Sequence, residues 1–212
     1  MKRVVATSIS VGLATGLYGI SFGALAAASG LDLASIVLLS VLMFSGGSQF
    51  AFLGVVASGG SAVAAITSAW LLGVRNSFYA LRLSTIIQPR SAWKLIAAQL
   101  SIDESNAVSA AQKGLQHQRV GFWVTGAAVF VFWNIATILG ALAGDLLGSA
   151  QTWGLDAAAA AAFLGLVWNQ LRNNRLVALS SAAVALVGSL FLPAGVPVLL
   201  TVFVALFSKG TK

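Results

Sequence analysis

Two adjacent carboxyl groups, Asp103 and Glu104, lie near the middle of an otherwise apolar stretch that runs from Ala92 to Ala111. Inside a bilayer an ionised carboxylate costs about 2.5 to 3.5 kcal/mol, so it is expected to face a polar cavity or a charged partner. Neighbouring residues of a regular helix point about 100° apart, so the two carboxyls can face one small ligand only if the backbone is irregular. Otherwise one of them has a structural partner. A surface loop with helix-capping Ser and Asp residues is the alternative.

A run of glycine and polar residues interrupts another apolar stretch, Leu33 to Ala57. Paired glycines disfavour a continuous helix, because each costs about 1 kcal/mol relative to alanine. A break frees backbone groups, which at membrane depth is tolerated only where they are buried in protein or line an aqueous cavity. In transporters the N-terminus of such a half-helix receives an anionic substrate group. A kinked helix packed on a neighbour is the alternative. The candidate substrate-binding residues here are Ser45, Gly46, Gly47, Ser48 and Gln49.

A cationic face is predicted in the stretch from Ser61 to Ile87. Arg75, Tyr79 and Arg82 are spaced i, i+4 and i+7, so they share one helix face, which could meet the carboxyl pair. Arg82 is near the end of the stretch and is expected to extend to the membrane surface, whereas Arg75 is deeper and needs an ionic or substrate partner. The candidate substrate-binding residues of this stretch are Arg75, Asn76 and Tyr79.

These residues belong to a chain with the composition of a membrane protein. Of 212 residues, 58% are hydrophobic and 8% are charged, and the mean hydropathy is +0.94. A soluble domain has roughly 25% charged residues. The net charge of +7 comes from basic residues in short loops and at segment ends, which is typical of membrane orientation signals and not of nucleic-acid binding. The sequence therefore predicts a single all-α, polytopic membrane domain over residues 1–212.

Eight hydrophobic segments are predicted, with six to eight full spans and with segments two and four broken. The first is expected to be a membrane helix, because it is longer than the 7 to 15 apolar residues of a signal peptide. It carries a stripe of small residues, Gly12, Gly16, Gly19 and Gly23, that would let another helix pack closely. The segments are Val4–Ala28, Leu33–Ala57, Ser61–Ile87, Ala92–Ala111, Val120–Ala143, Ala157–Leu171, Leu176–Leu192 and Val196–Phe207.

The basic residues leave one conflict in the predicted orientation. If all eight segments cross, most basic loops are cytoplasmic and the loop from Asp145 to Asp156 is external, but Arg90 and Lys94 would also be external. The conflict disappears if segments two and four enter and leave on the same side of the membrane.

Three further polar residues carry specific expectations. Asp32 is expected to be the N-cap of the next helix. His117, the only histidine, lies in a predicted loop from Gln112 to Arg119 and is expected to be solvated and not a proton relay. Asn134 is expected to hydrogen-bond across helices.

The residue types exclude several kinds of chemistry. The chain has no cysteine, no His/Cys cluster with metal spacing, no nucleotide-binding loop and no serine near a plausible base. We therefore expect neither an enzyme nor a metal or cofactor protein. The polar residues at depth suit a zwitterion with an apolar tail, whose carboxylate could meet helix amides or Arg75 and whose ammonium could meet Asp103 or Glu104.

Three motifs in order resemble the AzlC family, the large subunits of branched-chain amino acid exporters. They are Leu42 to Phe50, Arg75 to Tyr79, and Ile102 to Ser105. The resemblance implies a bacterial inner-membrane exporter of valine, leucine and isoleucine, with methionine as a further candidate. It also implies a small AzlD-type membrane subunit as partner and the proton gradient as driving force. A higher oligomer of this heteromer is a further possibility that the resemblance leaves open.

The chain departs from the family pattern around the arginine. Gly73 and Asn76 stand where the family usually has an asparagine before the arginine and a histidine after it. Any role of that histidine in the family therefore cannot be carried over to Asn76. A non-transporting scaffold or assembly subunit is the alternative function, and it predicts that Arg75 or helix caps neutralise the carboxyls.

Overall fold

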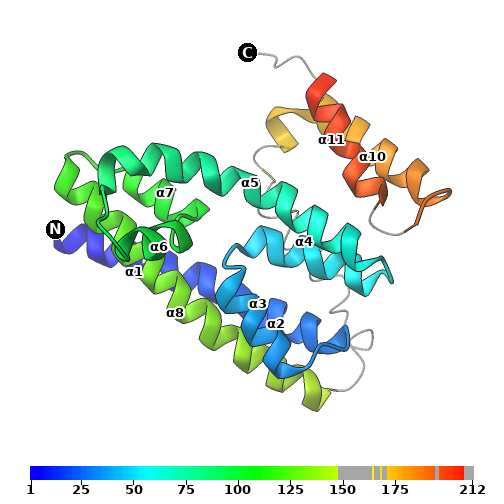
Figure 1. Cartoon of the computed structure of the whole chain (residues 1–212), viewed down its shortest axis with the longest axis horizontal. Coiled ribbons are helices and arrows are strands. Elements are labelled where there is room, and N and C mark those ends of the chain that lie inside the picture. The colour runs from blue at the N-terminus through cyan, green and yellow to red at the C-terminus, as the bar shows by residue number, and fades with distance from the viewer. Residues whose placement is uncertain (148–163, 165–167, 169–170, 194–195, 208–212) are drawn as a thin grey trace.

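The computed structural model describes residues 1–147, 164, 168, 171–193 and 196–207, and their regular structure is entirely helical (Figure 1). The predicted all-α class is confirmed. Within the described residues, two continuous helical stretches are long and apolar enough to cross a membrane, Lys2–Ala28 and Leu115–Gly144. Several other apolar helices are shorter, and the predicted number of six to eight full spans stays a prediction.

The longest helix, α8 (Leu115–Leu147), packs in parallel with α1 (Lys2–Gly16) and α2 (Tyr18–Ala28). A Cβ added at Gly12 would meet Ala128, and one added at Gly23 would meet the carbonyl oxygen of Thr137. Positions on both helices thus increase together, which means that the helices run in the same direction. The predicted glycine stripe is a helix-packing surface, because only residues without a Cβ allow this approach.

Helices α3 (Leu33–Leu42) and α4 (Gly46–Ala57) form a hairpin. Helix α3 begins where α2 and α8 end, and it runs back along α8 until the Phe44 and Phe130 rings are 5.0 Å apart. Its N-cap is Asp32, as predicted: the Ser35 amide donates to Asp32 Oδ1 at 2.8 Å. This bond and one from the Ser35 hydroxyl hold the pKa of Asp32 below its usual value. Helix α4 then returns to the end from which α3 started.

Helix α5 (Ala62–Ile87) runs the length of the bundle. Its first turns pack on the last turns of α4 through Val55, Ala64 and Ala65. Its last turn lies at the start of α8, where Arg119 Nε donates to the carbonyl oxygen of Ile86 at 2.8 Å. It therefore ends at the opposite end of the bundle from where α3 and α4 enter.

Helices α6 (Trp93–Gln99) and α7 (Asp103–Ala110) form a second hairpin from that opposite end. The Trp93 and Trp123 rings are 5.8 Å apart. Leu100 packs on Gly126, and Val108 packs back on Gly121. The hairpin thus enters along the first half of α8, turns near its middle and leaves again.

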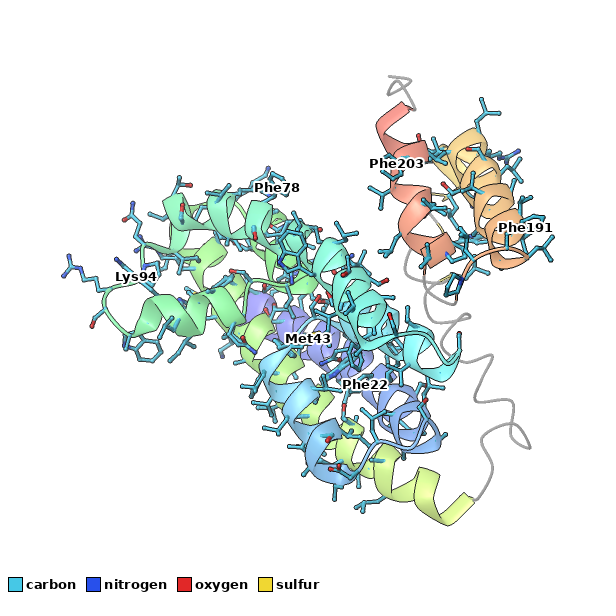
Figure 2. All side chains as sticks on the ribbon, turned by 45° about the vertical axis from the view of Figure 1, so that its right-hand side comes forward. Phe22, Met43, Phe78, Lys94, Phe191 and Phe203 are labelled. Carbon is cyan, nitrogen blue, oxygen red and sulfur yellow. The ribbon has the colours of Figure 1, made fainter. Side chains whose placement is uncertain are left out.

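The two hairpins remove the orientation conflict in the sequence. Arg90 and Lys94 follow α5, so they lie at the same end as Lys2 and Lys113; Figure 2 shows Lys94 projecting from that end. Asp32 lies at the other end, next to the turn that closes α2. All of these basic residues therefore share one side without any full crossing by segments two and four.

Several local predictions need correction. Helix α8 begins at Leu115, so most of the predicted loop before Val120 is helical. His117 is in its first turn, with Nε2 3.4 Å from the N-terminal amine at an exposed position. Asn134 Nδ2 donates to Phe130 of its own helix and not across helices. A short helix pair, α10 (Arg175–Ser189) and α11 (Val196–Phe207), closes the described chain. The part of the predicted external loop after Leu147, with Asp156, and most of segment six lie outside the described residues.

Candidate functional site

The tips of the two hairpins meet at a small enclosed cavity, which we call the central pocket. Its volume is about 40 Å³, enough for a few water molecules at most. Each hairpin contributes its turn and the first turn of its second helix, and the junction of α1 with α2 and the middle of α8 complete the wall. The lining residues are Thr15, Tyr18, Phe44, Ser45, Gly46, Gly47, Phe50, Ile102, Asp103, Glu104, Val129 and Trp133.

Asp103 is held by two residues of α5. Arg75 Nη2 lies 2.8 Å from Asp103 Oδ2, and the Tyr79 hydroxyl donates to Oδ1 at 2.8 Å. Both members of the ion pair are about one-third exposed, with 32% of the Arg75 side chain and 41% of the Asp103 side chain accessible. The predicted meeting of the α5 face with the carboxyl pair is confirmed for these residues. Arg82 instead donates to Asn106 at 3.4 Å.

Glu104 is the carboxyl without a side-chain partner among the residues that the structure describes. Asp103 and Glu104 both lie in the first turn of a regular helix. The sequence allowed either an irregular backbone with both carboxyls facing one ligand or a regular helix with one carboxyl in a structural pair. The structure has the second arrangement. Both negative charges lie at the N-terminus of α7, where the helix dipole favours them. The alternative, a surface loop between two short helices, is correct in part: α6 and α7 are short and Ser105 takes part in a capping box, but the turn between them lines the central pocket.

The first turn of α4 presents its free amides to the pocket. The first hydrogen bond of the helix runs from the Gln49 amide to the Ser45 carbonyl, and no side chain caps the helix. The amides of Gly46 and Gly47 thus have no partner within the helix. A Cβ at Gly47 would lie 2.6 Å from Arg75 Nη2, so glycine lets the guanidinium rest against this backbone. The break itself is at Met43 to Ser45, so it begins one residue before the predicted run from Phe44 to Gln49 and is shorter, because the glycines begin α4.

Of the remaining predicted residues, Gln49 and Ser48 form hydrogen bonds within the hairpin α3–α4, whereas Asn76 lies in a neighbouring cleft. Gln49 is fully buried, and its Nε2 donates to the carbonyls of Leu39 at 3.2 Å and Ser40 at 3.4 Å, which ties α4 to α3. The Ser48 hydroxyl donates to Ser45 Oγ at 3.2 Å. Asn76 does not line the central pocket. It lines a larger neighbouring cleft, where its Oδ1 is buried without a hydrogen-bond partner.

Two residues with clear roles at the site, Ser105 and Trp133, were not among the predicted site residues. Ser105 is fully buried; its Oγ accepts from the Ile102 amide at 3.1 Å and donates to the Leu100 carbonyl, which fixes the turn before Asp103. Its place directly after Glu104 was a usable signal. Trp133 lines the central pocket, and its Nε1 is buried without a partner. Nothing in the sequence separates it from the other tryptophans.

Comparison with known proteins gives a family and no individual relative. No match was found among curated proteins or solved structures. Among the described residues no group of three or more His, Cys, Asp or Glu side chains could hold a metal ion. The model of the AzlC protein family matches residues 10–147, which include both hairpins and the whole central pocket. The chain therefore belongs to the AzlC family, the membrane components of branched-chain amino acid transport.

Proposed function

We propose that this protein is the large subunit of a secondary exporter of branched-chain amino acids, in which the substrate's charged groups bind at the meeting point of the two hairpin tips. The observation that carries the proposal is the central pocket. Free helix amides and an unpaired carboxyl line this pocket in the middle of an apolar bundle, and the Arg75 guanidinium lies against two of the lining residues, Asp103 and Gly47. Such a set of groups complements a zwitterion.

The unpaired carboxyl, Glu104, is assigned the coupling role. Asp103 already forms two bonds, so its charge is used to orient Arg75. Glu104 lines the pocket and is available to take up a proton or to bind the substrate ammonium. The substrate carboxylate is assigned to the Gly46 and Gly47 amides, with Arg75 Nε as a buried donor that has no partner.

The proposed setting is the bacterial inner membrane, with a small AzlD-type subunit as partner and the proton gradient as driving force. The end of the bundle that carries Lys2, Arg90, Lys94 and Lys113 is assigned to the cytoplasm, because basic residues are retained there. Both hairpins are then re-entrant, one from each side of the membrane.

The test is export from cells that are loaded with a valine-containing dipeptide and express both subunits. Glu104→Gln should abolish the fall in intracellular valine while the amount of protein in the membrane stays at the wild-type level. Asp103→Asn should lower both export and thermal stability, because it leaves Arg75 without its partner. Normal export by Glu104→Gln would remove the coupling role of this residue.

The scaffold function has one observation in its favour, the neutralisation of Asp103 by Arg75. It predicts that substitutions in the pocket reduce the recovery of the partner subunit and leave export of the remaining complex unchanged. Unchanged intracellular valine in cells with both wild-type subunits would favour this alternative over transport.

A further inference from the structure

A second cleft lies beside the central pocket, and we call it the lateral cleft. Its volume is about 570 Å³, within the range of roughly 300 to 1,000 Å³ that is usual for small-molecule sites. It is bounded by the hairpin α3–α4, by α5 and by the end of α6. Phe44 and Ser45 line both the lateral cleft and the central pocket, so these two residues form the wall between them.

The lateral cleft has one polar corner and otherwise apolar walls. The Ser48 hydroxyl donates to Ser45 Oγ at 3.2 Å. Gly73 of α5 lies next to this pair, since a Cβ added at Gly73 would be 3.2 Å from Ser48 Oγ. Asn76 is one helical turn further along the same side of α5, and its buried Oδ1 has no partner. The walls are formed by aliphatic and aromatic side chains, among them Leu39, Phe52, Ile66, Trp70 and Val74.

The central pocket is too small to hold an entire branched-chain amino acid. A substrate whose charged groups lie at Ser45 and the start of α4 therefore has room for its side chain in the lateral cleft, which Ser45 also lines.

We propose that the lateral cleft binds the apolar side chain of the substrate, and that Trp70 and Val74 set the range of side chains accepted. This proposal rests on the proposed function. The open shape of the cleft explains how one site takes side chains of different lengths. Selection is then made by volume and apolarity, while the hairpin tips recognise the charged groups common to all amino acids.

The experiment changes the size of the cleft and measures the order of preference among substrates. Cells with both subunits are loaded with dipeptides that release valine, leucine or phenylalanine. Val74→Phe should reduce leucine export more than valine export, by about tenfold, since one methylene in an apolar pocket gives discrimination of this order. Trp70→Ala should raise phenylalanine export relative to valine.

The matched control is Phe78→Ala on the same helix. Phe78 is as exposed as Trp70, 65% against 69%, but it does not line the cleft, so its removal should leave the order of preference unchanged. An unchanged order in both cleft variants, at normal protein levels, would overturn the proposal. So would a uniform loss of export together with loss of the co-purified small subunit, because the cleft would then be a subunit interface. If the wild-type pair exports none of the three amino acids, the proposed function itself fails.

Discussion

At the scale of single residues, the two neighbouring carboxyls have different surroundings. Asp103 is bonded to Arg75 and Tyr79, while Glu104 faces the central pocket without a side-chain partner in the described chain. In the proposed function Asp103 therefore positions Arg75, and Glu104 is the carboxyl assigned the coupling role.

The position of Arg75 depends on the glycine beneath it. Gly47→Ala should displace the guanidinium, because the new Cβ would lie 2.6 Å from Nη2. We expect export to fall by about tenfold or more, since small misplacements of a positioning group have large effects on a reaction step. Gly54→Ala on the same helix is the control, because a Cβ there meets no atom within 4 Å. Equal export by the two variants would show that Arg75 tolerates displacement.

At the scale of elements, each hairpin can turn inside the apolar bundle because a side chain of the hairpin itself hydrogen-bonds the backbone near the turn. The turn of α6–α7 is held by Ser105, which bonds the Ile102 amide and the Leu100 carbonyl. The turn of α3–α4 is held by Gln49, which bonds two carbonyls of the preceding helix. Backbone groups inside an apolar bundle need such partners, because no water is present to replace them.

Ser105→Ala should therefore destabilise the second hairpin. It removes the hydroxyl that bridges the Ile102 amide and the Leu100 carbonyl, so that only the direct 3.0 Å bond between them remains, at a cost of about 0.5 to 1.5 kcal/mol. The measurement is the thermal unfolding midpoint of the purified complex in detergent. Ser101→Ala is the control, because the Ser101 hydroxyl only donates to the Ala97 carbonyl of the preceding helix. Similar midpoints for both variants would contradict the role assigned to Ser105.

The N-cap of α3 should make a pH-dependent contribution to stability. The pKa of Asp32 is lowered from its usual 3.8 by the bonds from Ser35, so its contribution is fully present above pH 3.8. It is lost as the pH falls through the lowered value in the folded state. Asp32→Asn keeps a good cap that does not titrate. The stability of wild type relative to this variant should fall on acidification, and a pH-independent difference would contradict the assignment.

At the scale of the whole molecule, two hairpins enter from opposite ends and meet in the middle. Helices α5 and α8 run from one end of the bundle to the other and, together with α1 and α2, form the frame around the two hairpins (Figure 1). Because the central pocket is formed only where the tips meet, movement of either hairpin would open it toward one end. This arrangement suits alternating access to a fixed site.

Accessibility to a thiol reagent tests the two entry sides. The chain has no cysteine, so single cysteines can be introduced without further changes. Ala34→Cys and Ser58→Cys flank the first hairpin and should react from outside intact cells. Ala92→Cys and Lys113→Cys flank the second hairpin and should react only after permeabilisation. Labelling of Ala34 and Ser58 from different sides would mean that α3 and α4 cross the membrane together and do not form a re-entrant hairpin.

The sequence alone determined the helical membrane class, the family and the candidate carboxyl, arginine and tyrosine residues. These follow from composition, from the i, i+4, i+7 spacing of α5 and from motifs that are local in the chain. The glycine stripes predicted close helix packing for the same reason, since a missing Cβ is visible in the sequence. The sequence also showed that segments two and four were broken.

Only the tertiary structure decided how these residues are used. Whether Asp103 or Glu104 meets Arg75 depends on the rotation of α7 against α5, which no local pattern encodes. The structure also decided that segments two and four turn back and meet at their tips, because that depends on which stretch of α8 each one packs against. The lateral cleft was likewise invisible in the sequence, since it depends on how four successive helices pack against one another.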